Sequence, residues 1–121
     1  MRFTQKFFCL ITCLIMCGVL VLVGTENAFA NQAHTILSKL SDPEKNATLT
    51  KFMKQSDEDC DTVVKNFFQG FDKDRNAYWN VACKNKKSFV IMIENDSAGS
   101  TKIMSCDLLK MLNAGECFKK F

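Results

Sequence analysis

The cysteines divide this chain into two parts. The chain has 121 residues and seven cysteines, and three of the cysteines lie in an apolar run at residues 7–23. The other four are spread over the more polar remainder: Cys60, Cys83, Cys106 and Cys117. An even number of cysteines in a small exported domain implies disulfides, whereas cytosolic cysteines stay reduced. Whether these four cysteines form disulfides that stabilise the fold therefore depends on whether the apolar run directs export.

Residues 1–30 have the three parts of a secretory signal peptide. A short basic start precedes the apolar run at 7–23, and Ala28 and Ala30 place small side chains where signal peptidase requires them. The sequence predicts cleavage after Ala30 and a mature chain that begins at Asn31. An uncleaved membrane anchor stays open as an alternative, because the apolar run approaches the roughly 17 to 25 residues of a spanning helix.

Residues 31–56 are predicted to form a helical N-terminal arm. Apolar residues recur at helical spacing up to Leu40, and Pro43 then suits the first turn of a second helix. The segment is polar enough to extend from the folded part of the chain as a mobile arm.

Residues 57–121 are predicted to form a disulfide-stabilised α+β domain. Its first element is a helix, because five residues recur at i, i+3, i+4, i+7 and i+8: Cys60, Val63, Val64, Phe67 and Phe68. Three β-like runs follow, separated by polar turns: 77–83, 88–94 and 101–106. A final short helix is predicted from Asp107 to Gly115, with its leucines buried. The predicted order is a helix, a three-stranded antiparallel sheet and a short C-terminal helix.

This order of elements favours one pairing of the cysteines. A helix followed by an antiparallel strand places Cys60 near Cys83 at one end of the sheet, and the final helix must fold back, which allows Cys106 to meet Cys117. The alternative pairs Cys83 with Cys106 and Cys60 with Cys117. A zinc or redox site is disfavoured, because such sites use closely spaced cysteines or a Cys-x-x-Cys motif.

No group of residues has the pattern of a catalytic or cofactor-binding site. The turn at 72–76 begins like a calcium loop, but Ala77 takes the glycine position and Cys83 that of the closing glutamate. His34 is the single histidine and is predicted to lie on the surface. Charges of both signs are mixed along the chain and form no basic stripe. The sequence therefore predicts no enzyme, no metal, no cofactor and no nucleic-acid partner.

One face of the predicted sheet is a candidate binding face. Strand side chains alternate between faces, and four residues point away from the side on which Trp79 is buried: Tyr78, Asn80, Val90 and Met92. Helices on one side of an antiparallel sheet leave its other side open. An open, partly apolar face would bind a partner, whereas cover by the N-terminal helices would make it a second core layer.

Part of the chain resembles known proteins. The residues concerned are AYWNVAC at 77–83, FVIMI at 89–93, Ser105-Cys106 and Cys117-Phe118. Over about residues 59–121, the chain resembles small exported proteobacterial proteins that have no assigned function. The helix followed by three strands is also similar to PepSY-type domains. That second similarity implies protease inhibition or an accessory role at the cell envelope, by analogy of element order alone.

The favoured function is that of a small exported, non-catalytic binding or accessory module, in the periplasm or secreted. Its expected partner is a protein of the cell envelope. Two alternatives are a membrane-tethered subunit of an envelope complex and a redox factor that uses a cysteine thiol. Contact with the membrane is expected only if the apolar run at 7–23 stays attached.

Overall fold

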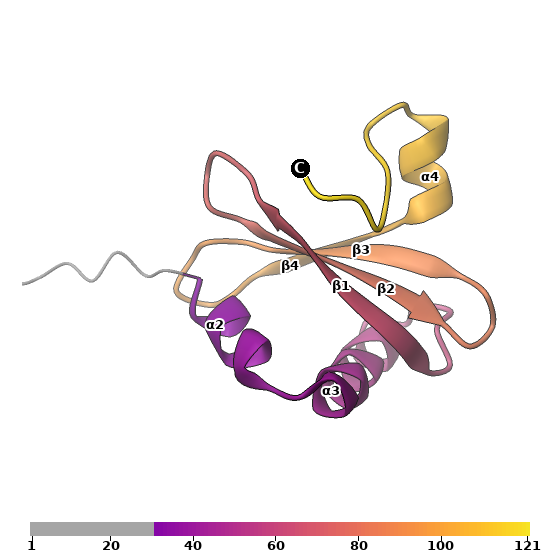
Figure 1. Cartoon of the computed structure of the whole chain (residues 1–121), viewed down its shortest axis with the longest axis horizontal. Coiled ribbons are helices and arrows are strands. Elements are labelled where there is room, and N and C mark those ends of the chain that lie inside the picture. The colour runs from indigo at the N-terminus through magenta and orange to yellow at the C-terminus, as the bar shows by residue number, and fades with distance from the viewer. Residues whose placement is uncertain (1–30) are drawn as a thin grey trace, which may run out of the picture.

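A four-stranded antiparallel sheet organises the chain in the computed structural model, which describes residues 31–121. The described elements are, in chain order, α2 (Gln32–Lys39), α3 (Asp42–Gln55), β1 (Val63–Phe71), β2 (Ala77–Cys83), β3 (Ser88–Ile93), β4 (Thr101–Ser105) and α4 (Cys106–Met111). The strands lie in sequence order, and α2 and α3 cover one side of the sheet while α4 and the C-terminal tail lie on the other (Figure 1). We call these two sides the helix face and the far face. The predicted signal peptide lies outside the described residues.

Local capping explains where the first two helices begin. The Asn31 side chain accepts a hydrogen bond from the His34 amide and so caps α2. At the start of α3, Glu44 accepts hydrogen bonds from the backbone N–H and hydroxyl of Ser41, at 2.9 and 2.6 Å. Pro43 occupies the first turn, where a missing N–H costs nothing. The two helices predicted within residues 31–56 are confirmed.

These helices are part of the folded domain and do not form a separate arm. Leu37 of α2 and Leu49 and Met53 of α3 are buried in the same cluster as Trp79 of β2. The sheet contributes alternate residues to this cluster: Ala77, Trp79, Val81, Cys83, Phe89, Ile91 and Ile93. The predicted boundary between an arm and a domain at residue 57 therefore crosses a single hydrophobic core.

The segment predicted to be the first helix of the domain is a strand, and the sheet therefore has four strands rather than three. β1 pairs antiparallel with β2 along its whole length. Phe67 and Phe68, predicted on one helical face, lie on opposite faces of the sheet. Phe68 packs on Trp79 in the core, at 5.1 Å between ring centroids. Phe67 lies next to Phe118 of the tail, at 6.2 Å.

Irregular pairing of β1 explains the wrong prediction, because one of its two register shifts lies within the residues whose spacing indicated a helix. The register shifts once between Val63 and Lys65 and again between Phe68 and Gly70. Each shift adds a residue on β1 and changes which face the next side chain occupies. The apolar residues of β1 consequently lose simple alternation and recur at a spacing that mimics a helix.

The other elements agree with the prediction, with one exception in the last helix. The strands predicted at 77–83, 88–94 and 101–106 are β2, β3 and β4. The last helix is shorter than the predicted 107–115: it spans Cys106–Met111, and its N-cap Ser105 accepts from the Leu108 amide. Its leucines are not buried: Leu108 is 39% exposed and Leu112 is 61% exposed.

Two disulfides join distant parts of the chain, in the pairing that the order of elements favoured. Cys60, in the loop after α3, is bonded to Cys83 at the end of β2, with 5.4 Å between their Cα atoms. Cys106 is bonded to Cys117 and closes the loop that contains α4, with 5.9 Å between Cα atoms. Disulfides of this kind indicate an oxidising compartment outside the cytoplasm.

Candidate functional site

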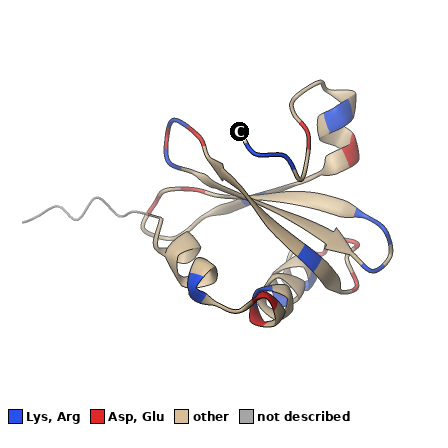
Figure 2. Cartoon of the chain, in the orientation of Figure 1, with Lys and Arg blue, Asp and Glu red and all other residues tan. Residues whose placement is uncertain are grey.

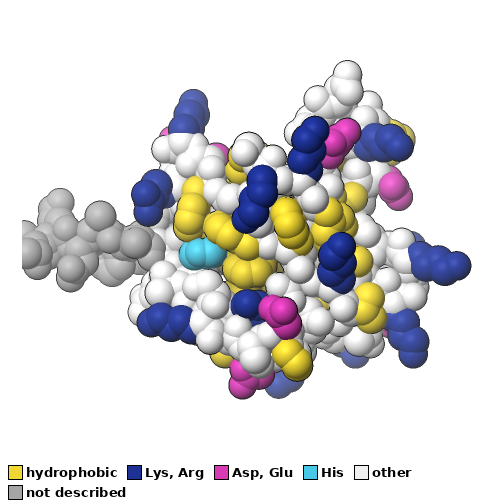
Figure 3. Space-filling model, in the orientation of Figure 1, with side chains coloured by type: hydrophobic (Ala, Val, Ile, Leu, Met, Phe, Trp, Pro, Cys, Tyr) yellow, Lys and Arg dark blue, Asp and Glu magenta, His cyan; other side chains and the backbone are white. Residues whose placement is uncertain are grey.

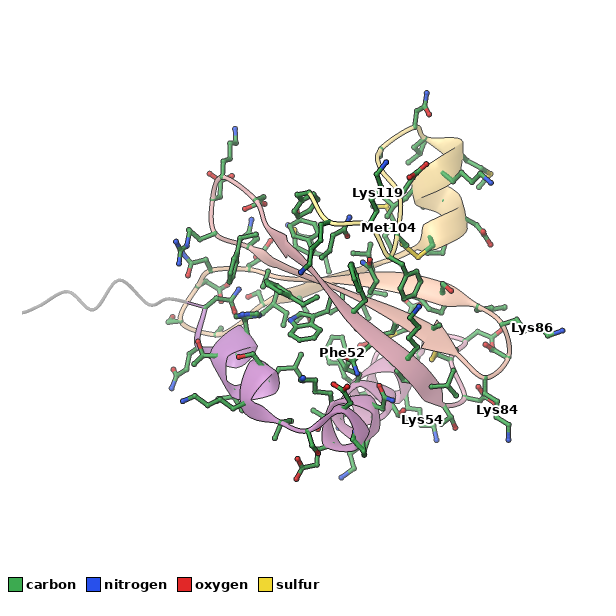
Figure 4. All side chains as sticks on the ribbon, in the orientation of Figure 1. Phe52, Lys54, Lys84, Lys86, Met104 and Lys119 are labelled. Atoms are coloured by element: carbon green, nitrogen blue, oxygen red, sulfur yellow. A yellow bond between two sulfur atoms is a disulfide. The ribbon has the colours of Figure 1, made fainter. Side chains whose placement is uncertain are left out.

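The far face is partly open, and the N-terminal helices do not cover it. The chain's own C-terminal segment crosses part of it, and we call residues 116–121 the C-terminal strap. In Figure 4, Met104 and Lys119 lie on the side of the sheet that carries α4, whereas Phe52 lies on the side of α3. Of the four residues of the predicted binding face, one is covered by the strap and three line a pocket beside it.

Asn80 belongs to a buried polar network that holds the strap. Its side chain is fully buried, and its Nδ2 donates to Oε1 of Gln69 at 3.0 Å. Its Oδ1 accepts from the Phe118 amide at 2.5 Å. Gln69 in turn donates through Nε2 to the Glu116 carbonyl oxygen at 3.1 Å. The prediction that Asn80 lies on an exposed binding face is therefore wrong, because its side chain binds other parts of the same chain.

Aromatic and cationic contacts hold the rest of the strap on β1 and β2. The Lys120 ammonium donates to the Phe68 carbonyl oxygen and lies 4.7 Å from the centre of the Phe68 ring. The Phe121 ring packs edge-on against Tyr78, with 5.2 Å between centroids. Phe121 also covers Gly70, where an added Cβ would lie 2.9 Å from its ring. A side chain at position 70 would push this ring away.

The other three predicted residues line a pocket beside the strap. Tyr78, Val90 and Met92 form its floor, and the cavity has a volume of about 290 Å³. Its walls come from β4, α4, the loop after α4 and the strap, and include these residues: Lys102, Ile103, Met104, Leu109, Ala114, Gly115, Glu116 and Phe121. We call this cavity the far-face pocket. Its lining is mainly apolar.

The polar groups at the pocket are already bound within the chain. The Tyr78 hydroxyl donates to Oδ2 of Asp72 at 3.1 Å, and Lys102 pairs with Glu94. Burial raises the pKa of the Tyr78 hydroxyl, and the neighbouring Asp72 carboxylate raises it further. Tyr78 therefore stays a protonated donor at neutral pH. The surface that this pocket offers is therefore mainly apolar.

Asp72 explains the turn that resembled a calcium loop. Its carboxylate accepts from the amides of Asp74 and Asn76, the Asn76 side chain and the Tyr78 hydroxyl. Burial acts to raise the pKa of Asp72, but these hydrogen bonds outweigh it and keep the pKa below its ordinary value. The turn is therefore held by hydrogen bonds within the chain. Among residues 31–121, no group of three or more His, Cys, Asp or Glu side chains could hold a metal ion.

His34 is not the surface residue that the sequence predicted. It is half-buried against the rings of Phe68, Phe71 and Trp79, with centroid distances of 4.5, 4.8 and 5.7 Å. The Trp79 indole N–H donates to Nδ1 of His34 at 3.1 Å. Burial lowers the pKa of His34 below its ordinary value. The imidazole is therefore neutral at pH 7.

The described cysteines are all bonded. Cys60 and Cys83 are 2% and 3% exposed, and Cys106 and Cys117 are half-buried. Within residues 31–121, a thiol-dependent activity would have to begin by opening one of these two bridges. Basic and acidic residues are interspersed over helices, turns and strap (Figure 2). Within residues 31–121, no helix is long and apolar enough to cross a membrane.

No protein-family model, curated protein or solved structure matches this chain. The resemblance to exported proteobacterial proteins and to PepSY-type domains therefore stays a prediction. The element order behind the PepSY comparison also changes, since β1 replaces the helix that was predicted before the three strands.

Sequence reasoning found the pocket floor but missed its walls. Alternation in β2 and β3 is enough to place Tyr78, Val90 and Met92 on one face. The walls depend on how the loop closed by Cys106 and Cys117 folds back over the sheet, and no local pattern encodes that path. The aromatic residues Phe118 and Phe121, close to the second cysteine of this loop, were the available signal.

Proposed function

We propose that this chain is a small exported binding module that holds an apolar side chain of a protein partner in the far-face pocket and performs no catalysis. The observation that carries the proposal is the pocket itself. It is an apolar cavity on a face where the buried amides of Gln69 and Asn80 are already satisfied by the strap.

The size of the pocket favours a side chain over a cofactor. Sites for drug-sized ligands usually enclose roughly 300 to 1,000 Å³. The far-face pocket, at about 290 Å³, lies at the lower end of that range. Burying one leucine or phenylalanine there would contribute about 1.5 to 3 kcal/mol, which suits an anchor residue within a larger interface.

The surroundings of the pocket favour a protein partner over a small apolar molecule. Apolar side chains on β4, at α4 and in the strap remain exposed next to the pocket: Met104, Leu108, Met111, Leu112 and Phe121. Exposed apolar side chains on the elements that wall the pocket favour a protein partner. Methionine side chains adapt to differently shaped partners. The two disulfides support a place for this interaction in the periplasm or outside the cell.

Selection from a random peptide library on the immobilised exported protein tests the proposal. The expected result is enrichment of peptides that share one large apolar residue. Met92→Glu, which places a carboxylate in the pocket floor, should weaken their binding by about tenfold or more. Leu109→Glu, on the pocket wall and on the surface of α4, is the second variant and should act in the same direction.

The matched control is Ile36→Glu, which makes the same kind of change at an apolar residue that is 59% exposed on α2. Because α2 lies on the helix face, this variant should bind the selected peptides like the unmodified protein. Enrichment without an apolar consensus, or equal binding by all variants, would overturn the proposal.

A further inference from the structure

A second, polar pocket opens between α2 and the turn that joins β1 to β2. It has a volume of about 220 Å³ and shares no lining residue with the far-face pocket. Its lining comes from α2 with its cap, the end of β1 and the turn: Asn31, His34, Thr35, Ser38, Phe71 and Arg75. None of these residues is acidic. We call this cavity the α2 pocket.

Trp79 fixes which imidazole nitrogen of His34 carries the proton. An indole N–H can only donate, so the His34 Nδ1 that receives its hydrogen bond must be unprotonated. In the neutral imidazole the proton then sits on Nε2. Among the described residues, Nε2 has no hydrogen-bond partner. His34 therefore keeps one oriented N–H donor free.

Arg75 provides a positive charge at the same pocket. Its guanidinium lies 5.3 Å from the centre of the Phe71 ring, and the His34 ring meets Phe71 edge-on at 4.8 Å. Arg75 forms no ion pair within residues 31–121. In the same turn, the Asp72 carboxylate is engaged by Asn76, Tyr78 and the Asp74 amide, and the Asp74 side chain, next to Arg75 in sequence, is exposed.

The surface around His34 combines hydrophobic and basic side chains. In Figure 3 the histidine side chain (cyan) borders a patch of hydrophobic side chains, and Lys and Arg side chains surround the patch. Aromatic rings beneath an arginine hold its guanidinium in place without neutralising it. The fork of N–H groups is therefore available to a ligand.

We propose that the α2 pocket binds the phosphate group of a small phosphate ester or of a lipid headgroup, with Arg75 and the Nε2–H of His34 as its donors. A guanidinium matches two oxygens of a phosphate at once, and such charge-assisted hydrogen bonds are about twice as strong as neutral ones. A cavity of about 220 Å³ also leaves room for the part of the ligand next to its phosphate.

Titration of the full exported protein with inorganic phosphate and with glycerol 3-phosphate, followed by NMR of the His34 and Arg75 side chains, tests this site. Saturable shifts of the His34 Nε2–H and the Arg75 guanidinium signals are expected. Arg75→Gln should weaken binding by about tenfold to a hundredfold. Lys73→Gln removes the same charge from the same turn without lining the pocket, and should leave the affinity unchanged.

Two further comparisons complete the test. Arg75→Lys keeps the positive charge but loses the forked N–H groups, so this variant should bind phosphate less tightly than the unmodified protein. It also serves as a second variant at this position in case Arg75→Gln does not fold. Sedimentation with phosphatidylglycerol vesicles separates the two sources: binding that depends on Arg75 assigns a lipid headgroup, and binding of the soluble ester alone assigns a free metabolite. No saturable shift, or equal weakening by Arg75→Gln and Lys73→Gln, would overturn the proposal.

Discussion

Among single residues, Gly70 shows how closely the strap is fitted to the sheet. Gly70 and Gly115 both have positive φ, at 147° and 128°, so alanine is strained at either position. At Gly70 alone, the added Cβ would also meet the Phe121 ring at 2.9 Å, whereas nothing lies within 4 Å at Gly115. The two positions therefore separate backbone strain from the contact with Phe121.

Gly115→Ala is expected to lower the free energy of unfolding by about 1 to 2 kcal/mol, and Gly70→Ala by about 1 kcal/mol more. Chemical denaturation measures both losses. Adding Phe121→Ala to Gly70→Ala should remove the extra loss, because the clash disappears with the ring. Equal losses in the two glycine variants would show that the strap does not rest on Gly70.

His34 predicts a pH dependence of stability. Because burial puts its folded pKa below the ordinary value of about 6.5, the unfolded chain binds a proton at a pH where the folded chain does not. Stability should be complete above about pH 6.5, fall as the pH drops towards the folded pKa, and level off below it. The carboxylates with lowered pKa values, Glu44, Asp59, Asp72 and Asp96, titrate at lower pH.

Imidazole NMR and denaturation at a series of pH values measure this effect. His34 is the single histidine, so its signal is unambiguous. His34→Gln should abolish the step in stability near neutral pH. An imidazole midpoint in the folded protein at or above that of the denatured protein would contradict the burial of His34 against Trp79.

Among the elements, the last disulfide and the strap act as one unit. The Cys106–Cys117 bridge closes a loop with a sequence separation of 11 residues, and the Phe118 amide that binds Asn80 follows directly. Replacing both cysteines by serine is expected to lower the free energy of unfolding by about 3 kcal/mol if the bridge acts through loop entropy. The strap should lose more than the rest of the fold, because neither cysteine belongs to the helix-face core.

Amide hydrogen exchange distinguishes a local loss from a global one. The Phe118 amide should lose nearly all of its protection in the Cys106→Ser/Cys117→Ser variant, while amides of β2 and β3 should lose only the part that follows from the lower global stability. Replacing Cys60 and Cys83 instead should lower protection throughout, since both are buried in the core. Unchanged protection of the Phe118 amide in the Cys106→Ser/Cys117→Ser variant would show that the disulfide does not hold the strap on the sheet.

Most elements could be predicted from the sequence, and β1 shows why one could not. The capping pattern around Ser41, Pro43 at the start of α3 and the alternation in β2 are local signals that tertiary contacts leave in place. In β1, the register shift between Val63 and Lys65 breaks the alternation of Val63, Phe67 and Phe68, and only pairing with β2 reveals a strand. Its β-branched and aromatic residues were the evidence that should have outweighed the spacing.

In the molecule as a whole, the two faces of the sheet differ: one packs the hydrophobic core, and the other carries the strap and the far-face pocket. On the helix face, α2 and α3 pack on the sheet and bury Leu37, Leu49 and Met53 in the hydrophobic core. The far face is shared between the strap and the far-face pocket, so cover and opening lie side by side. Alternation predicted which residues lie on this face. It could not predict which of them the strap would cover, because that depends on contacts between residues far apart in sequence, such as Asn80 and Phe118.

The proposed function requires that the far-face pocket receive a side chain from a partner in the cell envelope. Photo-crosslinking from position 109, on the pocket wall, tests this requirement in the full chain expressed in its native cells, with position 36 on α2 as the matched control site. We expect one discrete protein adduct from position 109 that disappears with Met92→Glu, and none from position 36. Adducts of equal pattern and yield from both positions, or an adduct from position 109 that Met92→Glu leaves unchanged, would contradict the proposed function.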